Sequence, residues 1–373
     1  MLTLPGLIDI HVHLRTPGQE YKEDFYTGTQ AALAGGFTTV LDMPNNKIPI
    51  TTQVLLEQKI ELARQNIVCD VGFYFGSLGD NLEEFEKVTN RVRHPRPDRG
   101  SINNIGIDSR FRGNDTGVFG LKLYLNPTTG NFLINEEKLI KIYQAWSSNQ
   151  PILLHCEGET MPMALKVIKA TGKKTHICHV SSKEELSAII EAKNAGLPVT
   201  CGVTPHHLFL TEVDAKRLGS YGLMKPYLKT QADVDFLWNN LDSIDLIESD
   251  HAPHTKEEKD SDNPPFGVPG LETTLPLLLT ASSEGKLKVD DIKRLCHNNP
   301  AKIFNIPTDE NTYIEVDETK PYTLNPKPLF TKCGWSPFQG KKVKGKVKTV
   351  YLRGEKVFDQ GQILTKPGSG KII

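Results

Sequence analysis

The sequence lacks the features that would point to a membrane, a disulfide scaffold or a nucleic-acid partner. Lys and Arg number 44 against 45 for Asp and Glu, so the net charge of −1 gives no broad attraction to nucleic acid or to a membrane surface. No apolar run approaches the roughly 18–20 residues that a membrane span needs. The six cysteines are scattered without paired spacing, which favours reduced thiols over disulfides.

The first residues of the chain lead directly into a candidate core strand. We therefore expect no secretory signal peptide and a cytoplasmic protein. The basic run at 341–348 alternates between charged and apolar residues, which is typical of a solvated strand face and gives no case for nucleic-acid binding.

Short apolar runs alternate with amphipathic stretches along most of the chain. The candidate strands are 7–12, 37–43, 67–75, 118–125, 151–156, 174–180, 197–203 and 244–250. Helical periodicity falls between them, for example at 52–65, 82–92, 135–148, 159–170, 183–195 and 231–241. Strands separated by helices predict parallel βα units. Eight such units predict an α/β fold, a (β/α)8 TIM barrel, over residues 5–307.

Three segments stand apart from this alternation. Residues 308–373 carry short β-like runs and, with residues 1–4, predict a small β-rich satellite domain. Residues 93–117 are polar, Gly-rich and aperiodic, so we expect an exposed insertion. An RNA-binding arm is disfavoured there, because Asp and Asn are interleaved and no aromatic stacking set is present. Residues 251–272 form a long loop rich in Pro and Gly, which in a compact domain usually has a function.

Histidines recur where candidate strands end. His11 and His13 are two residues apart, so on a strand both imidazoles point to one side, which in a barrel is the lumen near its C-terminal mouth. His155 and His179 end the fifth and sixth strands, and Asp250 ends the eighth. One such histidine alone is more often a satisfied core residue. Four histidines and a carboxylate at separate strand ends favour a metal centre, and these ligand types suit Zn²⁺.

Lys122 is an unexpected cation inside the apolar strand at 118–125. A buried ammonium without a partner is costly, so a special state is expected. One account is that the side chain extends to the barrel rim. The other is addition of CO₂, giving a carbamate whose two oxygens bridge two metal ions, and spacing alone leaves both open.

With these residues in place, the chain resembles the amidohydrolase superfamily, and specifically the dihydroorotases, over nearly its whole length. The matching stretches are Gly6–Arg15, Asp42–Asn45, Gly120–Asn126, Ile177–Val180, Ser249–His254, Pro269–Thr273 and Asn298–Ala301. Residues 204–208, 345–347 and 352–354 are similar to the dihydroorotase domain of animal multifunctional pyrimidine-synthesis proteins. The resemblance implies reversible, zinc-dependent cyclisation of N-carbamoyl-L-aspartate to (S)-dihydroorotate in de novo pyrimidine (UMP) biosynthesis.

The resemblance implies two zinc ions per chain. The implied metal ligands are His11, His13 and Asp250 on the first zinc, His155 and His179 on the second, and carboxylated Lys122 bridging both. Asp250 would also be the catalytic general base, taking a proton from water and returning it to the departing ring nitrogen.

The resemblance also implies a set of substrate contacts, which are Arg15, Asn45, His254, Phe266, Gly267, Lys225 and Thr128. The first three match positions that hold the substrate's α-carboxylate, and the planar donor fork of an arginine suits that group. Phe266 and Gly267 match a loop that contacts the pyrimidine ring through its main chain. Thr128 matches a mobile loop that can close over the substrate.

The chain departs from the family pattern at several positions. Lys225 stands where the family has Arg or Asn, and lysine keeps a charge but loses the bidentate fork. The animal-type domain has a third metal that uses a cysteine before the strand-six histidine and a glutamate on strand seven. Here Cys178 is present but Gly202 replaces that glutamate, so we expect no third zinc. Residues 93–117 have no counterpart in the pattern.

Two other readings stay open. A hydantoinase or allantoinase would share the barrel and the metals, but such a site does not need the carboxylate pocket of Arg15, Asn45 and His254. A non-catalytic dihydroorotase-like partner of aspartate transcarbamoylase is disfavoured because such paralogues generally lack metal ligands that are complete here. The resemblance further implies a homodimer, with an association with aspartate transcarbamoylase left open, and no nucleic-acid or membrane partner.

Overall fold

A computed structural model describes residues 1–89, 117–127, 133–325 and 329–373. Its main sheet has the parallel strands β2 (Leu7–Val12), β3 (Phe37–Asp42), β4 (Asp70–Gly76), β5 (Val118–Tyr124), β6 (Ile152–His155), β7 (Thr175–Ile177), β8 (Val199–Val203) and β9 (Leu246–Ile247), in that order. Just past β9, His251 forms a parallel bridge with Val12 and its carbonyl accepts from His13 N at 2.8 Å, which brings the last strand back to the first. The predicted barrel is confirmed.

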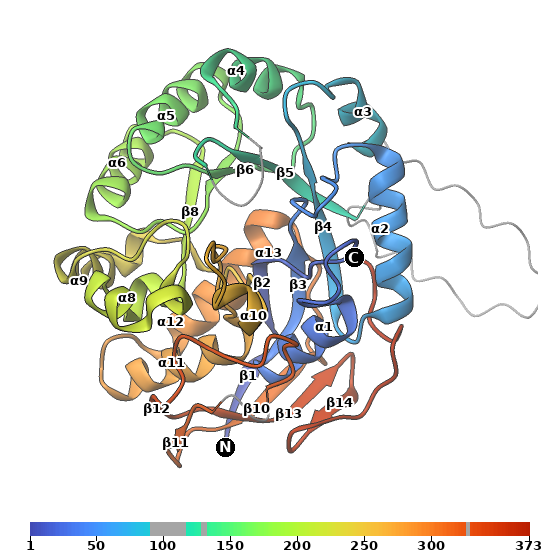
Figure 1. Cartoon of the computed structure of the whole chain (residues 1–373), viewed down its shortest axis with the longest axis vertical. Helices are drawn as coiled ribbons and strands as arrows, with labels where there is room; N and C mark the ends of the chain where they lie inside the picture. The colour runs from blue at the N-terminus through green and yellow to red at the C-terminus, as the bar shows by residue number, and fades with distance from the viewer. Residues whose placement is uncertain (90–116, 128–132, 326–328) are drawn as a thin grey trace, which may run out of the picture.

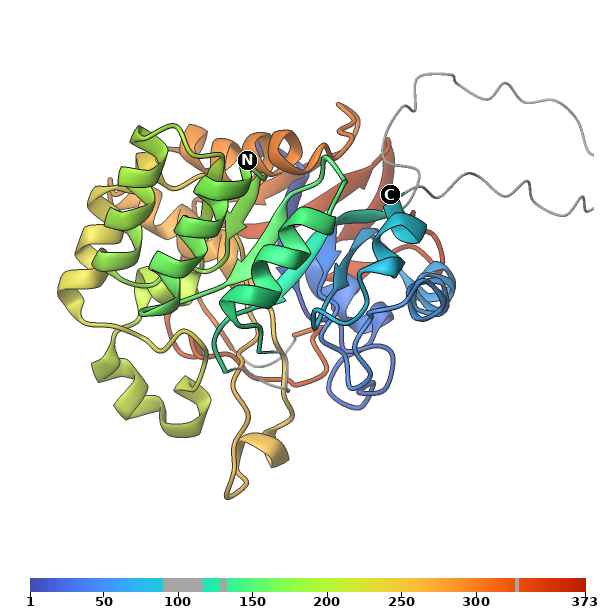
Figure 2. The ribbon, with the colours of Figure 1, turned by 90° about the horizontal axis from the view of Figure 1, so that it is seen from above.

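Helices surround this sheet, and Figures 1 and 2 show them as an outer ring. The ring contains α1 (Phe25–Ala34), α2 (Gln53–Asn66), α3 (Glu83–Thr89), α4 (Glu136–Ala145), α5 (Thr160–Thr171), α6 (Lys183–Asn194), α9 (Gln231–Asn239) and α11 (Leu271–Ser283). Shorter helical elements are α7 (Pro205–Phe209), α8 (Glu212–Leu218), η1 (Gly219–Gly222), η2 (Leu241–Ser243), α10 (Lys256–Lys259), α12 (Val289–Lys293), the π-helical η3 (Arg294–Asn298) and α13 (Asn299–Phe304).

The barrel strands are buried on both faces, which is why they read as nearly continuous apolar runs. Side chains such as Ile10, Tyr74, Phe119 and Leu153 form an inner cluster, and Phe304 of α13 packs into it. The predicted strands and helices agree with the observed ones to within a few residues in the described chain. The main difference is at the eighth strand, which covers only Leu246–Ile247 rather than 244–250.

A second, antiparallel sheet is built from the two ends of the chain. Its strands are β1 (Leu2–Pro5), β10 (Tyr313–Asp317), β13 (Lys346–Leu352), β14 (Glu355–Asp359) and β15 (Gln362–Ile363), in the order β1-β10-β13-β14-β15. A short pair, β11 (Tyr322–Thr323) with β12 (Lys342–Val343), lies apart from it. This sheet lies along one side of the barrel (Figure 1), so the predicted β-rich satellite is confirmed. The exact domain limits, 5–307 and 308–373 with 1–4, stay a prediction.

The segment between α3 and β5 and the loop after β5 contain residues whose structure is not described. The predicted exposed insertion at 93–117, except for its last residue Gly117, lies outside the described residues. The predicted substrate contact Thr128 also lies outside them. In the part of the chain that is described, no helix has the length and apolar character of a bilayer-spanning segment.

Candidate active site

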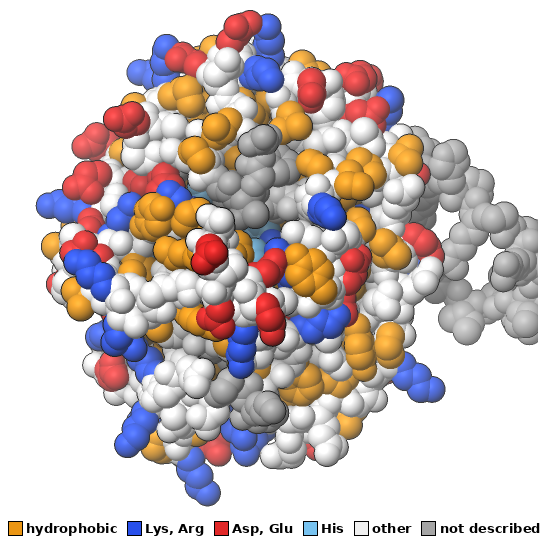
Figure 3. Space-filling view, viewed as in Figure 1, with side chains coloured by type: hydrophobic (Ala, Val, Ile, Leu, Met, Phe, Trp, Pro, Cys, Tyr) orange, Lys and Arg blue, Asp and Glu red, His pale blue; other side chains and the backbone are white. Residues whose placement is uncertain are grey.

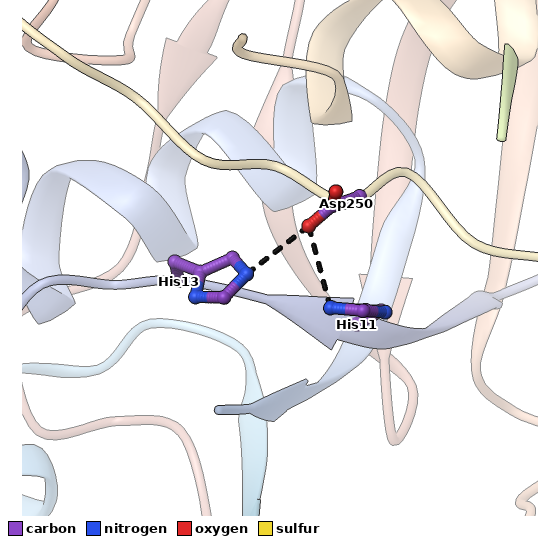
Figure 4. A group of neighbouring side chains, drawn as sticks. All are labelled: His11, His13 and Asp250. Carbon is purple, nitrogen blue, oxygen red and sulfur yellow. Dashed lines mark hydrogen bonds and ion pairs between the residues drawn. The ribbon is translucent and has the colours of Figure 1, made fainter. Parts of the chain in front are cut away.

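His11, His13 and Asp250 meet at the C-terminal mouth of the barrel (Figure 4). One oxygen of Asp250, Oδ1, lies 3.0 Å from His13 Nε2 and 3.3 Å from His11 Nε2. Burial lowers the pKa of His11 to about 3 and that of His13 to about 4, so both rings are neutral at physiological pH. Neutral imidazole nitrogens and an ionised carboxylate converging on one point are a set of metal ligands.

His155 and His179 form a second pair beside the first group. His155 Nδ1 and His179 Nε2 are 2.9 Å apart, and the His179 ring centroid is 5.3 Å from that of His11. Burial lowers the pKa of both rings, so at most one of the facing nitrogens carries a proton. Of their other nitrogens, His155 Nε2 faces Glu157 Oε1 at 3.8 Å, and His179 Nδ1 has no hydrogen-bond partner among the described residues. The two facing nitrogens are therefore the ones that converge, as the ligand atoms of a shared metal ion would.

Lys122 projects from β5 into the same region and is 1% exposed. Its Nζ donates to Cys178 Sγ at 3.0 Å and lies 5.1 Å from the centroid of the Tyr124 ring. Among the described residues, no carboxylate oxygen lies within 4.0 Å of this nitrogen to form an ion pair. The side chain is therefore buried rather than extended to the rim, and it has no counterion of the ordinary kind.

Three residues of the site have left-handed backbone conformations. The φ angles are 63° at Arg15, 41° at His179 and 45° at Asp250. Non-glycine residues adopt this region infrequently and at a cost, and such strain clusters at functional sites. At His179 and Asp250 the left-handed conformation comes two and three residues after β7 and β9 end. The extended backbone therefore stops before the ligands that the sequence places in these strands.

Glu248 was not among the sequence predictions, yet it is fully buried in this site. Its Oε2 lies 2.8 Å from His11 Nδ1, and its Oε1 accepts from the backbone N–H of His179. The carboxylate lies against Gly202, where a Cβ would collide with it. Together with His11 and Cys178 it forms a second buried group of metal-binding atoms. The carboxylate of Glu248 thus occupies the space beside Gly202 of β8. The expected absence of a third metal stays a prediction.

A cavity above these residues is lined by His11, His13, Arg15, Asn45, Tyr124, His155, His179, Lys225, Asp250, Ala252, Phe266 and Gly267. In the space-filling view, histidine surface is visible in a hollow near the centre of the face (Figure 3). Most of the predicted metal ligands and substrate contacts therefore share one cavity. Lys122 and His254 lie close by but do not line it.

The polar residues at one end of the cavity are oriented by further contacts. Asn45 Oδ1 lies 2.9 Å from His13 Nδ1 and can accept a hydrogen bond from it. The amide NH₂ of Asn45 then remains to donate. Arg15 is 5% exposed and donates through Nε to the carbonyl of Pro253 at 3.1 Å. Lys225 Nζ lies 3.8 Å from the centroid of the Tyr227 ring and 5.4 Å from that of Phe266. This end carries the donors that an anionic group requires.

Gly267 has a φ of 133°, and its N–H donates to the carbonyl of Leu223 at 3.0 Å. A Cβ at this position would lie 2.6 Å from the carbonyl oxygen of Ala252, so the close approach of the two loops needs glycine. The loop that contains Phe266 is thereby held against the cavity.

His254 is completely buried behind Arg15 and Phe266. Its Nε2 lies 3.1 Å from Arg15 Nη2 and 2.9 Å from the carbonyl oxygen of Phe266. On the other side of the ring, Nδ1 faces Lys22, a buried lysine that the sequence analysis did not single out. His254 is thus adjacent to the predicted carboxylate pocket and contacts residues that line it.

Comparisons with known proteins agree with this fold. The amidohydrolase family model matches residues 2–357. A dihydroorotase of Pyrococcus horikoshii is 36% identical over 386 residues, which cover 100% of this chain and 84% of that protein. The multifunctional protein CAD of Squalus acanthias is 44% identical over 375 residues, and the chain spans 16% of its length. The multifunctional protein pyr1-3 of Dictyostelium discoideum is 39% identical, again over 16% of its length.

Solved structures show the same fold. An L-hydantoinase from Arthrobacter aurescens superimposes with a TM-score of 0.88 at 24% identity, covering 99% of this chain and 88% of that one. An inactive dihydroorotase-like domain of a Chaetomium thermophilum CAD-like protein gives 0.79 at 24% identity, covering 99% and 98%. At such identities the likeness shows the fold alone.

Barrel, mouth and ligand set define a metal-dependent amidohydrolase, and the chain belongs to the amidohydrolase family. Within that family the chain groups with the dihydroorotases, two of which, from Pyrococcus species, are 36% and 34% identical to it over 84% and 87% of their lengths.

Proposed function

We propose that the chain catalyses the reversible cyclisation of N-carbamoyl-L-aspartate to (S)-dihydroorotate with two zinc ions. The observation that carries this proposal is that a group of metal-binding side chains and the histidine pair His155 and His179 line one cavity with an arginine. Metal-binding side chains alone suit any amidohydrolase. Arg15 and Asn45 at the end of the same cavity suit a substrate that carries a carboxylate.

The residues present fit zinc, because neutral imidazoles and carboxylates are its usual ligands and the facing nitrogens of His155 and His179 converge to 2.9 Å. His11, His13 and Asp250 would hold one ion, and His155 and His179 the other. The ammonium of Lys122 would lose one proton, and the free amine would then add CO₂ with loss of a second proton, which would replace a buried cation without a counterion by an anionic carbamate. When bound, the zinc ions lower the pKa of water toward about 7 and polarise the carbonyl that is attacked.

Asp250 is the proposed general base. Its Oδ1 contacts both histidines of the first group, so we assign the mobile proton to Oδ2. Burial opposes ionisation of Asp250, and the positive charge of bound zinc would favour its ionised form. In that form the carboxylate is able to accept a proton. In the hydrolytic direction it takes the proton of the attacking water and delivers it to the departing ring nitrogen.

The substrate's α-carboxylate is proposed to bind at Arg15 and Asn45. Arg15 uses Nε for the carbonyl of Pro253 and has Nη2 3.1 Å from His254 Nε2, so Nη1 and the second N–H of Nη2 remain for the anion. Fixing the substrate at this end aligns its amide carbonyl with the metal site and Asp250. Lys225 adds a positive charge on the same cavity wall, and the main chain of Phe266 and Gly267 faces the ring. His254 and Thr128 complete the proposed contact set.

The proposal is tested by a substrate panel on the zinc-loaded protein. Dihydroorotate should be turned over, while hydantoin and allantoin, which do not need the carboxylate pocket, should be poor substrates. Preference for an uncharged cyclic amide would instead indicate a hydantoinase or allantoinase. No turnover of any member with full zinc content would indicate the non-catalytic scaffold.

We also propose the remaining biological context. Relatives include proteins named as multifunctional, which supports an association of this chain with other activities, and aspartate transcarbamoylase is the partner that we propose. A homodimer and a cytoplasmic location belong to the same proposal, which size-exclusion chromatography of the pure protein and fractionation of cells would test.

A further inference from the structure

Lys22 is a buried lysine at the rim of the proposed carboxylate pocket. Only 4% of the residue is exposed, although it lies in a polar loop before α1. Its Nζ forms an ion pair with Glu258 Oε1 at 2.8 Å and lies 3.2 Å from His254 Nδ1. Tyr21 also donates to Glu258, at 2.9 Å. None of these contacts is used by the mechanism above, so the burial of this cation calls for another role.

The contacts of His254 decide which ring nitrogen carries its proton. Burial, followed by the charge of Arg15, lowers the pKa of His254 to about 3, so the ring has a single proton. The shortest contact of Nε2 is the carbonyl oxygen of Phe266, at 2.9 Å, and a carbonyl can only accept. Nδ1 faces the ammonium of Lys22, which can only donate. Both of these contacts are satisfied when the proton is on Nε2, whereas Arg15 Nη2 at 3.1 Å then faces a donor and Glu258 Oε2 at 3.3 Å faces a lone pair.

The opposite tautomer satisfies the other two contacts instead. With the proton on Nδ1, the ring would donate to Glu258 Oε2 at 3.3 Å and accept from Arg15 Nη2 at 3.1 Å. The lone pair of Nε2 would then face the carbonyl of Phe266, and N–H would face the ammonium of Lys22. One terminal N–H of Arg15 would also donate to the ring and would not be available to the substrate. Lys22 is what makes this second arrangement unfavourable.

We propose that Lys22, with its charge balanced by Glu258, is a positioning residue that keeps the proton of His254 on Nε2. In this state Nε2–H donates to the carbonyl of Phe266, and the ring offers no acceptor to Arg15 Nη2, 3.1 Å away, so this N–H group is left for the substrate's carboxylate. The role of Lys22 in catalysis rests on the proposed function, but the position of the proton does not. Lys22 acts through His254 and Arg15 and needs no contact with the substrate.

The first test is ¹⁵N NMR of protein labelled in histidine, without substrate. The chain has 11 histidines, and the signals of His254 are identified by their loss in His254→Asn. The wild type should show a protonated Nε2 and an unprotonated Nδ1, and Lys22→Arg should keep that pattern. Lys22→Met should move the proton to Nδ1. A wild-type His254 protonated on Nδ1 overturns the proposal. This outcome is measured on the wild type alone, so it tests the proposal even if Lys22→Met does not fold.

The second test is steady-state kinetics with dihydroorotate. Lys22→Met should raise KM by about tenfold, equivalent to one charge-assisted hydrogen bond, with a smaller change in kcat. Lys22→Arg should restore KM, whereas exposed Lys47→Met controls for the loss of one positive charge near the mouth and should leave it unchanged. An unchanged KM together with an unchanged tautomer in Lys22→Met overturns the proposal. An inactive wild type with the predicted tautomers would overturn the proposed function instead.

Discussion

Glu248 Oε2 lies 2.8 Å from His11 Nδ1, and both side chains are buried. The contact turns the proton of the His11 ring toward the glutamate and leaves the Nε2 lone pair on the side of Asp250. Carboxylates that orient metal-binding histidines in this way commonly change metal affinity by about 10- to 100-fold.

Glu248→Ala should therefore weaken zinc binding by roughly 10- to 100-fold, measured by competition with a chelator. Glu248→Gln keeps an oxygen that can accept a hydrogen bond from His11, so its zinc affinity should fall less than that of Glu248→Ala. Equal zinc affinity of the wild type and Glu248→Ala would show that His11 is oriented without this contact.

Lys122→Ala should lose zinc and activity together, because it removes the proposed bridge between the two metal sites. Short carboxylic acids should restore part of both, since they can supply a bridging anion. Lys122→Arg, which keeps the charge but cannot form the same carbamate, is the matched variant and should stay inactive. Full zinc content in Lys122→Ala, without rescue, would contradict the carbamate.

Asp250→Ala should abolish turnover because the general base is gone. Asp250→Asn keeps the shape and should lower kcat by at least about 10²-fold, the low end for a general base. The comparison separates loss of the base from loss of a ligand when zinc is counted in each variant. Activity near the wild-type value in either variant would remove Asp250 from this role.

Arg15→Ala should raise KM for dihydroorotate far more than for a cyclic amide without a carboxylate. Arg15→Lys retains the charge but not the planar fork, so an intermediate KM is expected. Steady-state kinetics with the two substrates in parallel give the comparison. An equal loss on both would mean that Arg15 supports the fold of the mouth rather than the carboxylate.

The buried Lys259 makes stability depend on pH in a defined direction. Its Nζ donates to the carbonyls of Leu223 and Pro265, and burial lowers its pKa from 10.5 to about 8. Between pH 8 and 10.5 the unfolded chain binds more protons at this group than the folded chain does. The contribution of Lys259 to the free energy of unfolding therefore rises across this window and is lost as the pH falls through 8.

Urea unfolding at a series of pH values checks this, with Lys259→Met as the reference that lacks the titrating group. The difference in unfolding free energy between wild type and Lys259→Met should shift in favour of the wild type as the pH rises. A difference that is constant with pH would show that Lys259 is protonated in both states.

Much of the fold could be predicted because strands buried on both faces leave long apolar runs and the helices between them keep their own periodicity. Most of the proposed metal ligands were equally visible, since histidines and Asp250 follow those runs. The short β9 was not, because Asp250 adopts a left-handed conformation that ends the strand early.

Glu248 left a signal that was overlooked, namely a charged residue in an apolar run and two positions before Asp250. Lys22 left none. It lies in a polar stretch that looks solvated, and its burial depends on His254 and Glu258, which are more than 200 residues away in the chain. Contacts between two loops arise from the closed barrel and have no local pattern.

The most direct test of the central claim is to titrate the zinc-free protein with zinc while measuring hydrolysis of dihydroorotate. Activity should rise with added metal and level off at two zinc ions per chain, with the reverse cyclisation of N-carbamoyl-L-aspartate appearing in parallel. A chain that binds two zinc ions and turns over neither compound would contradict the account.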